Sequence, residues 1–476
     1  MKKIFILLFS VCSWQLHAID YHVDNNPPFQ NIGDVPWATI GEGDRVFIHW
    51  RQTPYKEKWV INAVGTEQNP IQVIGVNGPQ GQQPIIDGNG ATTVPGVNFW
   101  NEPRGLIKIG GSNIPDNEIP QHIIIENLDI RSARPPYSFT NDNNQTEFYS
   151  NNAASLFVEV GQHITFRNNT IQDSGNGIFV AASDGDTQDI LIQGNYIHSN
   201  GNDGRIFEHN TYTAAIGIVY EGNRFGALRA GAGGNNLKDR SAGLVVRYNW
   251  IEDGNRQLDL VDAEDSSVLV NHPSYPTTHV YGNVLMESEG QGNSQILHYG
   301  GDSGTLADYR KGDLYFYNNT IISTRTGNTT LMRLSTNDET AHVFNNVFFG
   351  TANGSSLALI DGTGSVNLQH NWFKTGWQDC HCIPSGTIND LGNNLTGTDA
   401  MFNNFATQDF NPLSGSDLVN GGMDPLILLT AEYVVDKQYL KHQATQSRPT
   451  PDTIDIGAYE YCGTLSCDLI FADGFE

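Results

Sequence analysis

The chain has 476 residues, a formal net charge of −26 and 50 glycines, and only 16% of its residues are charged. Such an acidic chain is a poor partner for nucleic acid, whose phosphates are bound by basic surfaces. The many glycines and the lack of a long amphipathic helical pattern argue against a helical fold.

The first 18 residues have the pattern of a secretory signal peptide. Lys2 and Lys3 precede an apolar run from Ile4 to about Cys12, and Ala18 is a small residue before the expected cut. This run is too short to cross a bilayer, and we find no other stretch in the sequence that would cross one. We therefore expect an exported protein, outside the cell or at its surface.

The first coils of a repeating structure are predicted in residues 40–110, where RVFIHWR at Arg45–Arg51 reads as a strand. Pro135–Asn152 is polar and aromatic, and we expect it to be an inserted loop. Further inserts are expected near Asp262–Thr278 and Asp302–Lys311. Long loops on one side of a solenoid commonly build its binding face.

A short phrase then recurs: an apolar strand, an asparagine, one residue and another apolar residue. It reads IIIENLDI at Ile123–Ile130, ITFRNNTI at Ile164–Ile171 and finally VNLQHNWF at Val366–Phe373. The steps between the recurring asparagines are 42, 26, 28, 26, 34, 36, 27 and 25 residues. A period in the twenties, lengthened by inserts, is typical of a solenoid. The recurring asparagines are Asn127, Asn169, Asn195, Asn223, Asn249, Asn283, Asn319, Asn346 and Asn371.

Each unit predicts a strand with one buried face, because apolar and polar residues alternate. Asparagine suits the bend between two strands, since it tolerates the left-handed backbone conformation and bonds nearby backbone. Stacked over successive coils, these side chains are expected to form an internal hydrogen-bonded ladder. The alternatives are a β-sandwich and a propeller, but propeller blades need about 40–50 residues per repeat.

Positive charge gathers in residues 205–256, which hold about twice their proportional share of the 26 Lys and Arg residues. A single surface Lys or Arg is most often a solvated charge. A basic cluster, in contrast, can concentrate an anionic ligand even on an acidic protein. The basic residues are Arg205, Arg224, Arg229, Lys238, Arg240, Arg247 and Arg256.

The register places part of this cluster on one face. If Leu237 points inward, Lys238 and Arg240 both point outward. Asp259 follows Lys238 by 21 residues, which is about one coil. His209 precedes Lys238 by 29 residues. These side chains are therefore predicted to form one outer strip, with a spacing per coil close to the length of a sugar unit.

β-Elimination of a uronate needs a group that neutralises the carboxylate, a base for the C5 proton and a donor for the leaving oxygen. Lys238 is the expected base, because Arg240 and Arg256 would lower its pKa. Arg240 is the expected carboxylate clamp, and His209 or Tyr212 the expected acid. Arg205, Arg229 and Arg256 are expected to bind substrate, and Asp259, Asp262, Glu264 and Asp265 are candidate calcium ligands.

Two other functions remain open. A polygalacturonase-type glycoside hydrolase needs clustered carboxylates roughly 6.5–9.5 Å apart, which the acidic residues at 259–265 could supply. The usual Asn-x-Asp and Gly-His-Gly phrases of that family are absent. A non-catalytic glycan-binding or surface adhesin β-helix would only bind, with aromatic side chains as a stacking platform. In each case the expected partner is a polysaccharide and the expected state is a monomer.

Four cysteines follow the expected cut, and an even number in an exported protein predicts disulfides. Cys462 and Cys467 enclose a short loop and are the favoured pair. The alternative for Cys380, His381 and Cys382 is a zinc site.

The repeat resembles the right-handed parallel β-helix of the pectate lyase superfamily over roughly residues 40–375. The resemblance implies an all-β solenoid of about 10–12 coils with an asparagine ladder, and an exported bacterial protein similar to polysaccharide lyases. In several β-helical lyases the catalytic pair is a lysine and an arginine on the parallel strips, and Lys238 and Arg240 look like that pair.

FNPLSGSDLVNGG at Phe410–Gly422 and DIGAYEY at Asp455–Tyr461 resemble the closing segment of exported bacterial β-helix proteins, which caps the open last coil. CDLIFADGFE at Cys467–Glu476 resembles a sorting segment of secreted proteobacterial proteins, with a frayed terminus as the alternative. The expected parts are a signal peptide at 1–18, the β-helix at 19–375, a terminal coil and cap at 376–461, and a Cys-flanked tail at 462–476.

Overall fold

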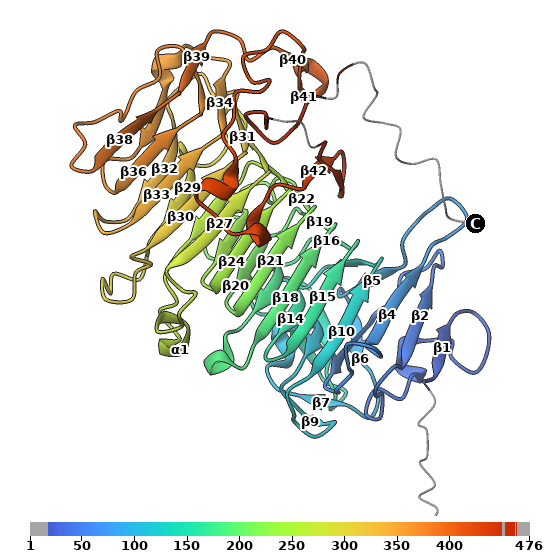
Figure 1. Cartoon of the computed structure of the whole chain (residues 1–476). Coiled ribbons are helices and arrows are strands. Elements are labelled where there is room, and N and C mark those ends of the chain that lie inside the picture. Colours follow the sequence, from blue (N-terminus) through green and yellow to red (C-terminus); the bar gives the residue numbers. More distant parts are fainter. Residues whose placement is uncertain (1–17, 450–452, 462, 464–476) are drawn as a thin grey trace, which may run out of the picture.

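The computed structural model describes residues 18–449, 453–461 and 463. Three long sheets run side by side along one solenoid, with 13, 11 and 13 strands (Figure 1). Neighbouring strands come from successive coils and pair in parallel, apart from one hairpin at the start of the third sheet. The chain is therefore a right-handed parallel β-helix, as the repeat predicted.

The bounds of the strands follow the order of each sheet. The first sheet contains β1 (Asp20–Val23), β2 (Arg45–His49), β4 (Ile71–Val76), β10 (Gln121–Glu126), β15 (Gln162–Arg167), β18 (Gln188–Gln193), β21 (Ile216–Glu221), β24 (Ala242–Arg247), β27 (Thr277–Tyr281), β30 (Asp313–Tyr317), β33 (Thr340–Phe344), β36 (Ser365–Gln369) and β38 (Thr387–Gly392). The second contains β5 (Ile85–Asp87), β11 (Asp129–Arg131), β16 (Thr170–Gln172), β19 (Tyr196–His198), β22 (Arg224–Phe225), β25 (Trp250–Glu252), β28 (Val284–Glu287), β31 (Thr320–Ser323), β34 (Val347–Gly350), β37 (Trp372–Lys374) and β39 (Leu395–Gly397). The third contains β13 (Thr146–Phe148), β12 (Ser138–Thr140), β6 (Ala91–Thr93), β3 (Glu57–Ile61), β8 (Gly105–Ile109), β14 (Ala154–Val158), β17 (Asn176–Val180), β20 (Thr211–Thr213), β23 (Leu237–Asp239), β26 (Leu258–Leu260), β29 (Gln295–Tyr299), β32 (Thr329–Leu334) and β35 (Leu357–Ile360).

The core fills the inside of the coils with rows of apolar side chains. Ile123 of β10 pairs in register with Ile164 of β15, which pairs with Ile190 of β18, and all three are buried. Alternation along each strand sends these side chains inward and the polar ones outward. Each coil therefore buries its apolar face against its two neighbours.

The predicted asparagine ladder is present and one rung longer at its end. Asn195 Nδ2 donates to Asn223 Oδ1 at 3.0 Å, and the pattern continues to Asn371, which donates to Asn394 at 3.0 Å. Asn127 was wrongly placed in the ladder: its Nδ2 bonds the carbonyl of Gly75 instead. In the coil before Asn169 the ladder position is held by Leu128, whose backbone N–H donates to Asn169 Oδ1.

The left-handed backbone belongs to the residue before each ladder asparagine, which corrects the sequence-based assignment. Asn168, Tyr248 and Asn345 have φ of 57°, 56° and 56°. The ladder residues that follow them, such as Asn249, are fully buried and bonded to both neighbouring coils. The bend is thus made beside the ladder, where the side chain is not needed for stacking.

After β39 the chain folds back along the side of the coils (Figure 1). It carries two hairpins, one of β40 (Phe402–Asn404) with β41 (Asp409–Pro412) and one of β42 (Lys437–Leu440) with β43 (Ala444–Ser447).

The DIGAYEY segment expected to cap the last coil packs laterally instead. Gly457 N donates to Asn345 O at 2.7 Å, and Ala458 N donates to Thr320 Oγ1 at 3.0 Å. The segment packs there because the outer face of the second sheet carries the apolar Trp250, which is buried when the segment lies against it.

The remaining short elements are the helix α1 (Ser267–Val270) and the pair β7 (Asn98–Phe99) with β9 (Ser112–Ile114). The inserts predicted near Asp262–Thr278 and Asp302–Lys311 leave the third sheet after β26 and β29 and lie on its outer side. No helix in the described part of the chain is long and apolar enough to cross a membrane.

Cys380 and Cys382 form a disulfide with each other. Their sulfurs are therefore not free thiolates, which removes the zinc alternative for these two residues. The favoured pair of Cys462 and Cys467 and the signal peptide lie outside the described residues, and so stay predictions.

Candidate functional site

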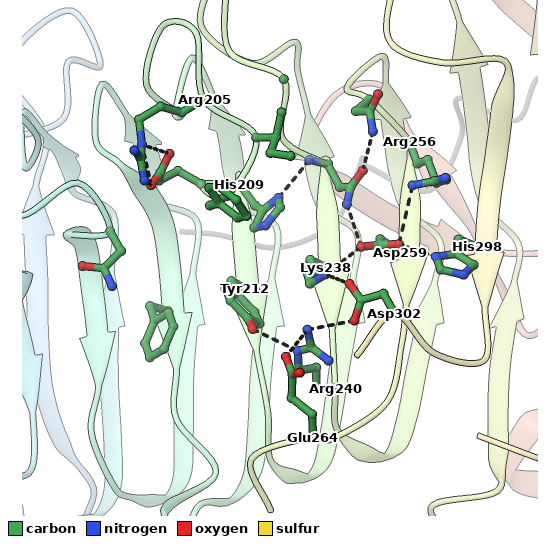
Figure 2. Close-up of a pocket in the computed structure, with 18 of the residues that line it drawn as sticks. Arg205, His209, Tyr212, Lys238, Arg240, Arg256, Asp259, Glu264, His298 and Asp302 are labelled. Atoms are coloured by element: carbon green, nitrogen blue, oxygen red, sulfur yellow. Dashed lines mark hydrogen bonds and ion pairs between the residues drawn. The ribbon is translucent and has the colours of Figure 1, made fainter. Parts of the chain in front are cut away.

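A cleft of about 1070 Å³ lies on the outer face of the third sheet (Figure 2). Its floor is a row of side chains in register, one from each coil, because parallel strands stack equivalent positions. The row reads Phe179, Tyr212, Lys238, Asp259, His298 and Arg333. Lys238 and Asp259 are neighbours as predicted, whereas the place expected for His209 is taken by Tyr212.

Lys238 of β23 points into the cleft between two carboxylates. Its Nζ donates to Asp259 Oδ2 at 3.0 Å and also to Asp302 Oδ2. Burial lowers the pKa of Lys238, but Asp259 and Asp302 more than offset this effect, so the pKa is raised. The expectation of a lowered pKa, based on Arg240 and Arg256, was therefore wrong, and Lys238 is a stable cation.

Arg240 follows Lys238 on the same face and contacts a tyrosine and three carboxylates, of which Asp262 is the most distant at 3.6 Å. Its Nε donates to Tyr212 Oη at 2.9 Å, and its Nη2 lies 3.0 Å from Asp302 and 2.8 Å from Glu264. Burial alone would lower the pKa of Arg240, but Tyr212 and Asp302 outweigh burial and raise it. The guanidinium is positioned to stabilise negative charge on the Tyr212 oxygen.

Asp302 was missed by the sequence reasoning, which noted only the insert that begins with it. Its two carboxylate oxygens bridge Lys238 and Arg240 (Figure 2). Burial raises the pKa of Asp302, but Lys238 and Arg240 lower it by more. The net pKa of Asp302 is therefore below its usual range. The insert is held in place by Asp262, whose Oδ1 accepts from Asp302 N at 2.8 Å.

The insert is also fixed from inside the solenoid. Arg310 is fully buried, donates from Nε to Val261 O at 2.7 Å and lies 3.4 Å from Asp239 Oδ1. Burial raises the pKa of Asp239, whose side chain also accepts from Thr213 Oγ1 at 2.7 Å. Together with the contact between Asp262 and Asp302 N, these contacts of Arg310 fix the insert at its first residue and near its last.

Asp259 connects Lys238 to a histidine and a serine. His298 Nδ1 lies 2.8 Å from Asp259 Oδ1, and His298 Nε2 lies 2.9 Å from Ser335 Oγ. Burial raises the pKa of Asp259, but His298 and Lys238 outweigh it and hold the pKa far below its usual range. Ser335 Oγ also accepts from Gly301 N at 2.9 Å and does not line the cleft, so this chain of contacts positions Asp259 and does not present a nucleophile.

His209 lies on the loop before β20 and is buried beside Tyr212. Its Nδ1 accepts from Asn235 N at 2.8 Å, which leaves the ring proton on Nε2. Burial, together with the charge of Lys238, lowers the pKa of His209 to about 3. His209 is therefore a neutral hydrogen-bond donor at neutral pH.

Of the arginines expected to bind substrate, two line the cleft. Arg205 lies at one rim and pairs with Glu208 at 2.9 Å, and Arg256 lies at the opposite end. Arg229 is outside the cleft, where it pairs with Asp173.

The four candidate calcium ligands do not form one donor set. The oxygens of Asp259 face Lys238 and His298, Asp262 holds the insert, and Glu264 pairs with Arg240. Asp265 lines a separate pocket of about 250 Å³. Within the described residues no three His, Cys, Asp or Glu side chains are grouped so as to hold a metal ion. The residues present therefore do not fit a calcium site.

No family model and no curated protein matches this sequence. Several solved structures are similar to this chain at low identity. The pectate lyase Pel9A is 11% identical, with 93% of this chain and 96% of that chain covered and a TM-score of 0.46. The alginate lyase from Paenibacillus sp. str. FPU-7 is 12% identical, with 69% and 92% covered and a TM-score of 0.41. A rhamnogalacturonan lyase is 13% identical, with 81% and 90% covered and a TM-score of 0.43. At these identities and TM-scores, the likeness carries no conclusion about activity.

Proposed function

We propose that this chain is an exported polysaccharide lyase that cleaves a uronate-containing polysaccharide by β-elimination. One observation carries the proposal: Lys238 and Arg240 together hold a carboxylate, that of Asp302, in the floor of a long open cleft. A uronate carboxylate has the same geometry and charge as the Asp302 side chain. Substrate would therefore replace Asp302 on these two cations.

The same arrangement supplies the chemistry of elimination. Lys238 and Arg240 neutralise the uronate carboxylate, which makes the neighbouring C5 proton more acidic. Tyr212 Oη, which accepts a hydrogen bond from Arg240 Nε, takes the C5 proton when it is deprotonated. The C5–H electron pair becomes the C4=C5 double bond, and the C4–O4 bond breaks. The leaving oxygen takes up the proton from the Tyr212 hydroxyl.

This scheme changes the roles of three of the four predicted catalytic residues, because Tyr212 now also accepts the C5 proton. Lys238 serves as a carboxylate ligand and not as the base, because the pKa of its ammonium is raised. His209 donates a hydrogen bond from Nε2 to the sugar, since its pKa of about 3 keeps the ring neutral. Arg240 and Tyr212 act as the clamp and the proton carrier.

The hydrolase alternative is disfavoured by the charge of the carboxylates. A glycosidase needs one carboxylic acid with a raised pKa to protonate the leaving oxygen. Asp259 and Asp302 both have lowered pKa values, since each faces Lys238. Neither of these two is therefore suited to act as the general acid, and Glu264, which also lines the cleft, is paired with Arg240 at 2.8 Å.

The test is incubation with polygalacturonate, alginate, chondroitin, hyaluronate and heparan, with and without chelator. Formation of the C4=C5 double bond is followed by its ultraviolet absorbance, and reducing ends are measured in parallel. We expect Tyr212→Phe to lower kcat by roughly 100-fold or more, as for loss of general acid–base catalysis. Tyr315→Phe, at a partly exposed tyrosine of the first sheet, is the matched control and should leave activity unchanged.

The outcomes separate the three functions. Double-bond formation that Tyr212→Phe removes supports the lyase, and loss of that activity in chelator would restore a role for calcium. New reducing ends without a double bond would identify a hydrolase. Binding of a polymer without either product would identify a glycan-binding protein.

A further inference from the structure

The end of the cleft toward the later coils carries positive charge that is poorly neutralised. Arg333 of β32 lies in register with His298, lines the cleft and is exposed. Among residues 18–449, 453–461 and 463, Arg333 has no ion pair or hydrogen bond from its side chain. A cation exposed in a cleft in this way is free to bind an anionic ligand.

Arg256 lies on the same side of the cleft, next to His298 and Asp259 (Figure 2). It donates to the neutral amide of Gln295 at 2.6 Å and reaches Asp259 Oδ1 only at 4.0 Å. Burial lowers the pKa of Arg256 and outweighs the nearby carboxylates Asp259, Asp361 and Asp302, which raise it, while the charge of Arg333 also lowers it. Two arginines that disfavour each other's charge would be stabilised by an added anion.

The cations elsewhere in the cleft already have carboxylate partners at short range. Arg205 pairs with Glu208 at 2.9 Å, and Lys238 pairs with Asp259 at 3.0 Å. The excess positive charge of the cleft therefore lies at one end, along the axis that a polymer would follow.

We infer that Arg256 and Arg333 form a second carboxylate subsite, which binds another uronate unit of the same polymer. Lys238, Asp259, His298 and Arg333 are successive rungs of one row, and strands are spaced about 4.8 Å apart. Arg333 thus lies about 14 Å along the row from Lys238. This distance corresponds to two or three sugar units beyond the unit held by Lys238 and Arg240.

This inference rests on the proposed function and narrows its substrate. A polymer with a carboxylate on every sugar, such as polygalacturonate or alginate, fills both subsites in any register. A polymer with a carboxylate on every second sugar fills both only when the two sites are an even number of sugars apart. Oligomers too short to reach Arg333 should bind without its help.

The test compares Arg333→Gln with the wild type on galacturonate and mannuronate oligomers of increasing length. We expect KM to rise roughly three- to tenfold for hexamers, in line with loss of one charge-assisted contact, while kcat stays unchanged. For dimers KM should not change. Arg45→Gln on β2, at an exposed arginine far from the cleft, is the control and should match the wild type. An unchanged KM for hexamers would overturn the subsite.

Binding separates failure of the subsite from failure of the lyase. If the wild type forms no double bond on any polymer, retention of polygalacturonate and alginate in native affinity gels replaces KM. Arg333→Gln should then weaken retention, and added salt should reduce the difference between the two proteins. Equal retention of both proteins, or no retention of either polymer, would overturn the inference.

Discussion

The charge state of Lys238 is decided by residues from three parts of the chain. Asp259 lies one coil after Lys238. Asp302 comes from an insert and lies 64 residues after Lys238 in the sequence. Both carboxylates face the ammonium and raise its pKa, whereas the charge of Arg240 lowers it. Lys238 is therefore fixed as a cation by partners that its sequence neighbours do not reveal.

Asp302→Asn tests whether the internal carboxylate occupies the substrate's place. The uronate would no longer compete with a tethered carboxylate for Lys238 and Arg240, so a larger fraction of the protein would be competent to bind. We expect KM for a cleaved polymer to fall by roughly fivefold, measured from initial rates. Asp308→Asn in the same insert should leave KM unchanged. A higher KM in Asp302→Asn would mean that Asp302 helps to bind substrate.

Along each sheet, the elements are held together by side chains that repeat once per coil. Asn223 accepts from Asn195 N and Nδ2 at 2.9 and 3.0 Å, and donates to Ile192 O and Asn249 Oδ1 at 2.8 and 2.9 Å. All of these groups are buried, so every one of them needs its partner. The ladder thereby fixes the register of neighbouring coils as well as contributing stability.

Asn223→Ala should lower the free energy of unfolding by about 3 kcal/mol, because it leaves buried donors and acceptors unpaired on both sides. Urea unfolding followed by circular dichroism would measure this change. The control is Asn394→Ala at the last rung, where the ladder has a neighbour on one side only and the side chain is partly exposed. An equal loss in both variants would contradict the view that ladder stability comes from neighbours on both sides.

At the scale of the molecule, the returning C-terminal segment covers one face of the solenoid. Trp250 of β25 stacks on Phe410 at 5.6 Å and on Tyr439 at 5.7 Å between ring centroids. Tyr248 Oη donates to Asp436 Oδ1 at 2.8 Å, which joins the same segment to the bend that follows β24. Coils from the middle of the chain are thus stabilised by residues near its end.

Phe410→Ala should lower the free energy of unfolding by about 3 kcal/mol, since the ring is buried and its loss leaves a cavity beside Trp250. The emission of tryptophan should shift to longer wavelength if water reaches the indole. Phe405→Ala removes a more exposed ring of the same segment and should cost less. A smaller effect of Phe410→Ala than of Phe405→Ala would contradict the lateral packing.

The sequence by itself determined the fold, because the recurring strand and asparagine pattern leaves few ways to bury each unit. It also placed Lys238, Arg240 and Asp259 on one outer face. Strand alternation determines which way each side chain points, and a separation of about one coil places Asp259 beside Lys238. The long steps near residues 262–278 and 302–311 indicated inserts on the side of the cleft.

Only the tertiary structure decided what these side chains do to one another. The depth of the Asp302 insert, its anchoring through Arg310 and the distance from Arg240 to Tyr212 depend on how loops settle on the sheet, which no local pattern encodes. The same holds for the lateral course of the C-terminal segment and for the bend residue beside each ladder asparagine. Periodic contacts follow from the repeat, whereas charge pairing and loop docking arise from contacts between residues far apart in the chain.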